Sequence, residues 1–227
     1  MSDPDIPVAA TVVLLRDGRN GPEVLMIERP DRGSFAGAWV FPGGKLDPGD
    51  TGPIGDATLP EEADARRAAV RETREETGLE VTASALLTLS CWDPPPGMPL
   101  RIRTWFFLCA APPEAELRLE PEEAVKAEWL RPPDALQRQA RGEMTLYPPT
   151  WVTLHGLAEA RDVDSAFAAA RMRGVQTFET QVRRGPDGPV FYWSEDAEYH
   201  GESPGAASGP RHRLETGVTP WVYTRRD

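Results

Sequence analysis

The sequence has little of several features that define other classes of protein. It contains two cysteines, Cys91 and Cys109, and three histidines, too few for a disulfide framework and without the ligand spacing of a zinc site. No apolar run approaches the length of a membrane span, and the N-terminal segment MSDPDIPVAA has no basic region of the kind that begins a secretory signal. Both cysteines lie in apolar stretches, which favours reduced, packed thiols. We therefore expect a cytoplasmic protein with no targeting segment and no membrane partner.

Basic residues are also in the minority. The chain has 25 lysines and arginines against 36 aspartates and glutamates, which gives a formal net charge of -11. The averaged field of such a surface repels the backbone of nucleic acids and anionic lipids, so we expect no nucleic-acid partner. A ligand that carries phosphates must then be bound by local basic groups or by metal ions.

The order of apolar and turn-forming segments indicates a mixed α/β chain. Its 227 residues, 40% of them hydrophobic, suffice for one domain with an elaboration or for two small domains. Thr58 and Glu61 form a capping-box pattern, which predicts a long helix that ends at Thr77 before Gly78. The predicted strands are 9–15, 24–27, 81–89, 102–110 and 127–130, and the other predicted helices are 132–141, 149–161 and 164–173. Four short strands are predicted in the tail, at 175–182, 190–193, 212–214 and 221–223.

The long helix carries the pattern with the clearest chemical meaning. In the stretch RETREETGL, which starts at Arg71, the spacing i, i+3, i+4 places Glu72, Glu75 and Glu76 on one helix face. Like charges at this spacing destabilise a helix by about 0.2–0.5 kcal/mol per pair unless a cation lies between them. Mg²⁺ prefers such oxygen ligands. The alternative is a solvated acidic face that Arg71 and Arg74 partly neutralise.

This stretch and the loop before it resemble the Nudix box. The box runs glycine, five residues, glutamate, seven residues, and then Arg-Glu-apolar-any-Glu-Glu-any-Gly-apolar. Residues 44–50 (GKLDPGD) are similar to its first half and residues 71–79 to its second half. The resemblance implies that Glu75 and Glu76 bind a metal, and that Glu72 is a further ligand or helps to activate water. It implies in addition an orienting role for Arg71 and a metal ligand in the carbonyl of Gly44.

The sequence departs from the box in two places. Asp50 stands where the family has its first glutamate, so its role as a ligand is open. Twenty residues, 51–70, then separate it from Arg71 where the family has seven, which we interpret as an insertion at 51–63 that lengthens the loop before the helix. Thr73 is a milder departure, at an apolar position of the box. Glu122, Glu123 and Glu128 flank the last core strand, where some members of the family have a catalytic carboxylate. Most acidic residues in such a loop are only solvated.

A second resemblance concerns the segment before the box. Residues 25–44 are similar to the signature of Nudix coenzyme A diphosphatases, with Arg29, Gly37 and the FPGG loop in place, but with Arg32 one residue early. The segment 146–150 (LYPPT) also resembles that branch. Guanidinium groups pair with phosphate oxygens, and glycines permit close approach of the backbone. The candidate ligand-binding residues are therefore Arg29, Arg32, Gly43 and Gly44, although two solvated arginines are an equal alternative.

Together the resemblances imply an αβα sandwich around a mixed sheet over residues 1–148. Residues 149–227 would be a helical and β-hairpin extension, packed on the core or at a homodimer interface. The implied enzyme is a pyrophosphohydrolase that uses Mg²⁺, with Mn²⁺ as a substitute. Its partner would be a small molecule, a nucleoside diphosphate linked to another moiety, coenzyme A or its esters among them. The alternatives are a non-catalytic nucleotide-sensing module and a diphosphate-ester isomerase that needs a reactive cysteine.

Overall fold

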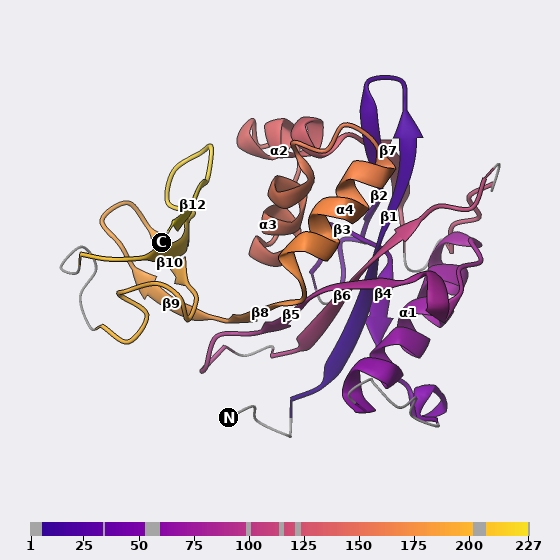
Figure 1. The fold of residues 1–227 in the computed structure, drawn as a ribbon, viewed down its shortest axis with the longest axis horizontal. Coiled ribbons are helices and arrows are strands. Elements are labelled where there is room, and N and C mark those ends of the chain that lie inside the picture. The colour runs from indigo at the N-terminus through magenta and orange to yellow at the C-terminus, as the bar shows by residue number, and fades with distance from the viewer. Residues whose placement is uncertain are drawn as a thin grey trace.

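The computed structural model describes residues 6–33, 35–52, 60–98, 101–113, 116–120, 124–201 and 208–226. This part of the chain forms a larger and a smaller β-sheet with α-helices packed on the larger one (Figure 1). The larger sheet contains β1 (Val8–Gly18), β2 (Gly21–Glu28), β3 (Trp39–Val40), β4 (Gly43–Lys45), β5 (Leu87–Asp93), β6 (Arg103–Ala110), β7 (Lys126–Leu130) and β8 (Gln176–Glu179). The smaller sheet contains β9 (Gln181–Arg184), β10 (Pro189–Tyr192), β11 (Arg211–Glu215) and β12 (Val222–Arg226). The helices are α1 (Pro60–Thr77), α2 (Pro132–Ala140), α3 (Pro148–Leu157) and α4 (Val163–Arg173), with 3₁₀ turns η1 (Pro48–Asp50) and η2 (Ala83–Ala85).

The larger sheet is mixed. Its strand order is β3-β2-β1-β6-β5-β8, with β4 paired to β1 and β7 paired to β2. The pairs β1–β6 and β5–β8 are parallel, and the other pairs are antiparallel. The central strands carry continuous apolar runs because both faces of the sheet are covered. The expectation of a mixed sheet between helical layers is confirmed.

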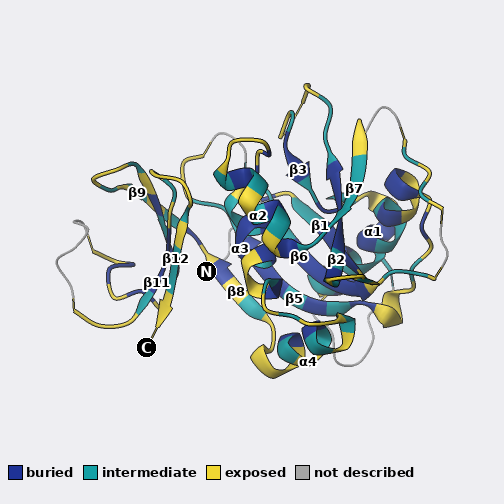
Figure 2. Ribbon diagram, turned by 90° about the horizontal axis from the view of Figure 1, so that it is seen from above, coloured by how far each residue is buried: buried dark blue, intermediate teal, exposed yellow. Residues whose placement is uncertain are grey.

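Alternation along β1 assigns side chains to the two faces. Val13 and Leu15 belong to one apolar core, which α2, α3 and α4 cover. Val12 and Leu14 belong to the other core, which α1 covers. All four side chains are fully buried, and Figure 2 shows the central strands β1, β2 and β6 in the colour of buried residues. The sheet therefore separates the α1 face from the α2–α4 face.

Small side chains bring α1 close to the sheet. Ala65, Ala68 and Ala69 are completely buried against the strands, while the opposite side of the helix carries the charged residues. Thr73, at the apolar position of the box, is also completely buried, and its hydroxyl donates to the Ala69 carbonyl at 2.7 Å. That bond satisfies the buried hydroxyl within the helix, so Thr73 substitutes for an apolar residue at little cost.

The C-terminal region shares the core of the α2–α4 face. β8 extends the larger sheet at the β5 edge, and Phe178 on β8 stacks on Trp92 with 3.7 Å between ring centroids. Trp193, which is completely buried, contacts both rings from the end of β10. Tyr223 of β12 contacts Trp193 in turn. Aromatic contacts thus join the smaller sheet to the larger one. The division of the chain into a core, residues 1–148, and an extension, residues 149–227, stays a prediction.

The structure corrects two predicted strands. The segment 81–89 was expected to be extended throughout, but residues 83–85 form η2 and β5 runs from Leu87 to Asp93. Val81 packs against the α1 core instead of pairing in the sheet. The segment 175–182 is divided between β8 and β9, which belong to different sheets. The capping residue Thr58 lies outside the described residues. None of the helices in the described ranges is both long and apolar enough to span a membrane.

Candidate active site

Arg71 is the centre of an ion-pair network on the exposed side of α1. Its Nη1 donates to Glu72 Oε1 at 2.8 Å and to Glu75 Oε2 at 2.9 Å. Its Nη2 donates to the Lys45 carbonyl at 3.0 Å and to Asp50 Oδ2 at 2.8 Å. The hydrogen bond to Asp50, followed by those to the glutamates, raises the pKa of Arg71 above its ordinary value. A permanently charged guanidinium therefore holds two of the three glutamates in place.

Glu76 points to a different neighbour. Its side chain is only 1% exposed, and its Oε2 accepts a hydrogen bond of 2.7 Å from the backbone amide of Gly43. Arg29 Nη1 lies 3.7 Å from Glu76 Oε1. The glutamate thereby joins α1 to β4 and to the end of β2. The structure brings Glu72 and Glu75 together at Arg71 and places Glu76 beside Arg29.

Two glycines allow β4 to lie directly against this network. A Cβ atom at Gly44 would overlap the carboxylate of Glu72, and one at Gly43 would overlap the backbone of β1. The strand position is secured by Thr11, whose hydroxyl lies 2.7 Å from the Pro42 carbonyl and 3.1 Å from that of Phe41. Sequence reasoning missed Thr11 as a positioning residue. A polar residue in an otherwise apolar strand was the only available signal.

Asp50 acts on the network through Arg71. Its carboxylate is almost completely buried and accepts from Arg71 and from the backbone amide of Asp47 at 2.8 Å. Burial opposes ionisation of this group, but the Arg71 and Asp47 hydrogen bonds and the charges of Arg71 and Arg67 outweigh it and hold the pKa of Asp50 below its ordinary value. As arranged here, the aspartate at the first glutamate position of the box orients an arginine.

The donors at this site have the chemistry of a hard-cation site. Glu72, Glu75 and Glu76 supply carboxylate oxygens on one side of α1, and close packing of Gly44 on Glu72 keeps backbone oxygens of β4 nearby. Hard divalent cations prefer such oxygen ligands. Within the described residues, no three acidic, histidine or cysteine side chains converge on one point, because Arg71 lies between Asp50, Glu72 and Glu75. The ligand set predicted for the metal, Glu72, Glu75, Glu76 and Gly44, fits the group in its chemistry.

The Gly-rich loop between β2 and β3 contacts the segment before α3. The rings of Phe35 and Tyr147 meet edge to face at 4.8 Å, and the Trp39 amide donates to the Thr145 carbonyl at 2.9 Å. Both aromatic rings are largely exposed. Arg32 is exposed in the same loop. The two segments that resemble coenzyme A diphosphatases are thus neighbours in space.

Other candidates from the sequence have structural partners. Glu128 binds Lys126 and Arg138, and these bonds, the Lys126 bond first, lower its pKa. Glu122 and Glu123 lie outside the described residues. Burial raises the pKa of Cys91 to about 12 and that of Cys109 to about 11, so neither thiol resembles the reactive cysteine that an isomerase would need.

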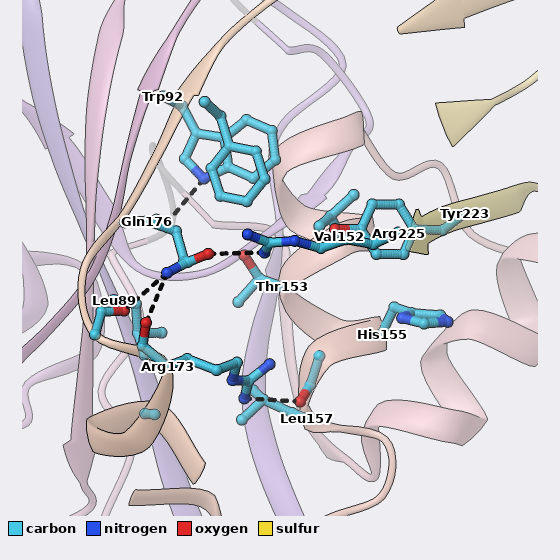
Figure 3. Close-up of a pocket in the computed structure, with 15 residues that line it drawn as sticks. Leu89, Trp92, Val152, Thr153, His155, Leu157, Arg173, Gln176, Tyr223 and Arg225 are labelled. Atoms are coloured by element: carbon cyan, nitrogen blue, oxygen red, sulfur yellow. Dashed lines mark hydrogen bonds between the residues drawn. The ribbon is translucent and has the colours of Figure 1, made fainter. Parts of the chain in front are cut away.

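A cavity lies on the opposite face of the sheet. Its volume is about 430 Å³, and α3, α4, β5, β8 and β12 line it (Figure 3). None of the predicted site residues is among its lining residues. The candidate chemistry is therefore placed on the α1 network and not in this cavity.

Comparison with known proteins decides the family. The sequence profile of the NUDIX domain family matches residues 5–148. The chain belongs to the NUDIX domain family. It is 30% identical over 132 residues to the CTP pyrophosphohydrolase of Escherichia coli (strain K12), a match that covers 58% of this chain and 80% of that relative. These findings make it an enzyme of the Nudix pyrophosphohydrolase type.

Solved structures agree in fold. A NUDIX hydrolase from Alicyclobacillus acidocaldarius is 27% identical, with a TM-score of 0.64 over 74% of this chain and 97% of its own. The NUDIX domain of Shewanella oneidensis NrtR, solved with ADP ribose, is 16% identical, with a TM-score of 0.51 over 76% of this chain and 93% of its own. At that identity the second likeness concerns the fold alone.

Proposed function

We propose that this chain is a Mg²⁺-dependent hydrolase that cleaves the phosphoanhydride bond of a nucleoside diphosphate linked to another moiety. The observation that carries the proposal is the packing of β4 on α1. Gly43 donates to Glu76 and Gly44 adjoins Glu72, so two of the three carboxylates of the box contact β4, while the third, Glu75, is bonded to Arg71 beside Glu72. The products would be a nucleoside monophosphate and the phosphorylated moiety.

We assign the acidic residues to the metal ion and the basic residues to the glutamates and the substrate phosphates. Glu72, Glu75 and Glu76 would hold the cation, which would neutralise the anhydride oxygens and lower the pKa of an attacking water. Arg71 holds Glu72 and Glu75 next to each other by hydrogen bonds from one nitrogen. Arg29, beside Glu76, offers a guanidinium to a phosphate oxygen of the substrate. Glu72, which accepts from Arg71 Nη1 at 2.8 Å, would be a further ligand of the cation or would help to activate the attacking water.

Coenzyme A or its esters form the second candidate among such substrates. The specific support is the contact between Phe35 and Tyr147 and the bridge from Ala38 to Thr145, which join the two segments with coenzyme A diphosphatase character. The loop with Phe35 also carries Arg32 and follows Arg29, and two partly exposed rings with nearby arginines in sequence suit a ligand with both a nucleotide and an apolar arm. We expect release of 3′,5′-ADP from coenzyme A; its absence under conditions in which another diphosphate is cleaved would remove this candidate.

The rival is a module that binds a nucleotide without cleaving it. A substrate panel tests both: dinucleotides, nucleotide sugars, coenzyme A esters and nucleoside triphosphates, each with Mg²⁺ or Mn²⁺ and with products identified by mass spectrometry. The proposal requires turnover of at least one diphosphate that depends on metal and is lost in Glu75→Gln and Glu76→Gln. Saturable nucleotide binding with no product under any metal would favour the sensing module.

A further inference from the structure

The cavity on the α2–α4 face has the dimensions of a ligand site. Its volume of about 430 Å³ lies in the range of small-molecule pockets. It is bounded by α3, α4, β8 and β12 of the C-terminal region and by β5 of the N-terminal region, so both parts of the chain contribute to it (Figure 3). The proposed hydrolysis makes no use of it.

Two arginines supply the positive charge of the lining. Arg173 and Arg225 both face the cavity, and no aspartate or glutamate is among its lining residues, although the chain as a whole carries a charge of -11. Arg173 is held by backbone carbonyls, with Nη2 donating to Gly156 at 3.1 Å and Nε donating to Ala169 at 3.3 Å. Among the described residues, no carboxylate forms an ion pair with Arg173. The two hydrogen bonds therefore orient the Arg173 side chain, and no carboxylate of the described residues neutralises its charge in an ion pair.

Arg225 is oriented in a similar way. Its Nη1 donates to Gln176 Oε1 at 2.7 Å, and the amide nitrogen of Gln176 donates to the Arg173 carbonyl at 2.8 Å (Figure 3). Glu195 lies 3.3 Å from its Nη2, but both side chains are more than 40% exposed, so this ion pair is weak. Gln176 therefore ties the Arg225 guanidinium to the backbone at the C-terminal end of α4, where Arg173 lies.

The remaining wall is largely apolar. Leu89, Val152 and the stacked Trp92–Phe178 pair contribute to it. Tyr223 also lines the cavity, and its hydroxyl lies 2.9 Å from His212 Nε2. Such contacts restrain the side chains of the wall, which lowers the entropy lost on binding.

We infer that this cavity binds a small organic anion, with its phosphate or carboxylate group on Arg173 and Arg225 and its flat apolar body against Leu89, Val152 and Tyr223. Guanidinium groups suit either oxyanion, and the apolar wall selects anions that carry a ring. The site is separate from the carboxylates of α1, and the inference does not rest on the proposed hydrolysis.

Isothermal titration calorimetry on the full chain without metal tests the inference. The probes are phenyl phosphate and benzoate, which carry the two oxyanions, with phenol and inorganic phosphate as the separate halves. We expect one saturable site for phenyl phosphate or benzoate and much weaker binding of either half. Arg173→Gln and Arg225→Gln should each weaken binding about tenfold, as expected for a hydrogen bond to a charged group.

Matched controls lie beside each arginine. Arg171→Gln is on the same helix and Arg226→Gln is adjacent on β12, and neither residue lines the cavity, so both should bind as the wild type does. Arg225→Lys should recover part of the affinity. Circular dichroism and melting temperature verify that every variant is folded.

Three results would overturn the inference. One is the absence of saturable binding up to about 10 mM probe, the range of very weak ligands. Another is unchanged affinity in folded Arg173→Gln and Arg225→Gln. The third is loss of binding in Glu75→Gln with retention in both arginine variants, which would place the probe at the carboxylate helix. Since no turnover is measured, failure here leaves the proposed hydrolysis untouched.

Discussion

The two faces of the larger sheet are built on opposite principles. On the α1 face, alanines let the helix approach the strands, and the free side of the helix carries charge arranged around Arg71. On the α2–α4 face, the packing relies on large rings, with Trp92, Phe178 and Trp193 in mutual contact. The first face positions chemical groups, while the second unites the N-terminal and C-terminal parts of the chain. The difference predicts that substitution of a carboxylate proposed to bind the metal mainly alters turnover, and that loss of a buried ring on the other face mainly alters stability.

The largest effect should come from the aromatic face. Trp193→Ala removes a completely buried ring that contacts Trp92 and Phe178, and loss of a buried tryptophan costs about 3–5 kcal/mol of unfolding free energy. Chemical denaturation measures that change. Met172→Ala, at an 85% exposed position, should shift it by less than about 0.5 kcal/mol. Turnover per folded molecule should stay unchanged; a large fall would show that the two faces are coupled.

The next effect belongs to the carboxylate face. Glu75→Gln and Glu76→Gln should each lower turnover at least about a hundredfold, or about 2.7 kcal/mol of activation free energy, because a ligand of the catalytic metal is lost. Unfolding curves should move little, since glutamine keeps an oxygen for the Gly43 amide. Glu80→Gln, exposed just beyond the helix, is the matched control. Wild-type rates at saturating Mg²⁺ in either variant would end the metal assignment.

A third change tests whether Asp50 acts through Arg71. Asp50→Asn keeps the shape but removes the charge that Arg71 binds, and it should cost about 2 kcal/mol of unfolding free energy at pH 7. The folded pKa of Asp50 lies below its ordinary 3.8, so its stabilisation is present above that pH and is lost as the pH falls through the folded pKa. The difference between wild type and variant should therefore shrink below pH 3.8. A constant difference down to pH 2 would contradict the assignment.

The same comparison explains what the sequence could predict. The α1 face follows from local rules in part: helix periodicity places Glu72, Glu75 and Glu76 on one side of the helix, and the box spacing marks Gly43 and Gly44, but only Glu72 and Glu75 meet, at Arg71. Long-range details of that face did not follow, such as the Thr11 bonds to the FPGG loop, because they join residues about thirty positions apart. Arg71 was expected to orient the glutamates, but its anchoring by Asp50 across a lengthened loop required coordinates.

The aromatic face was less predictable. Helices 132–141 and 164–173 were predicted within a few residues, because prolines or a capping box mark their starts. The division of 175–182 between two sheets was not foreseen, since both halves have strand composition and only tertiary pairing separates them. The cavity could not be predicted from the sequence either. Its two arginines lie more than fifty residues apart, Arg173 at the end of helix α4 and Arg225 in strand β12.

The smallest effect should come from Thr73, on the packed side of the helix that carries the charged network. Its side chain lies on the packed, uncharged side of α1, and the other side of this helix carries the glutamates and Arg71. Thr73→Val keeps the shape and removes a hydroxyl whose acceptor, the Ala69 carbonyl, retains the helical hydrogen bond, so no polar group is left buried and unsatisfied. Unfolding free energy should change by less than about 1 kcal/mol, and turnover should stay at the wild-type value. Thr73→Asn is the contrasting variant: it places an amide in the same space without a partner and should cost about 1–3 kcal/mol. If Thr73→Val lowered turnover while the unfolding curve stayed in place, the hydroxyl would have a role in the carboxylate network, and the separation between the two sides of α1 would fail.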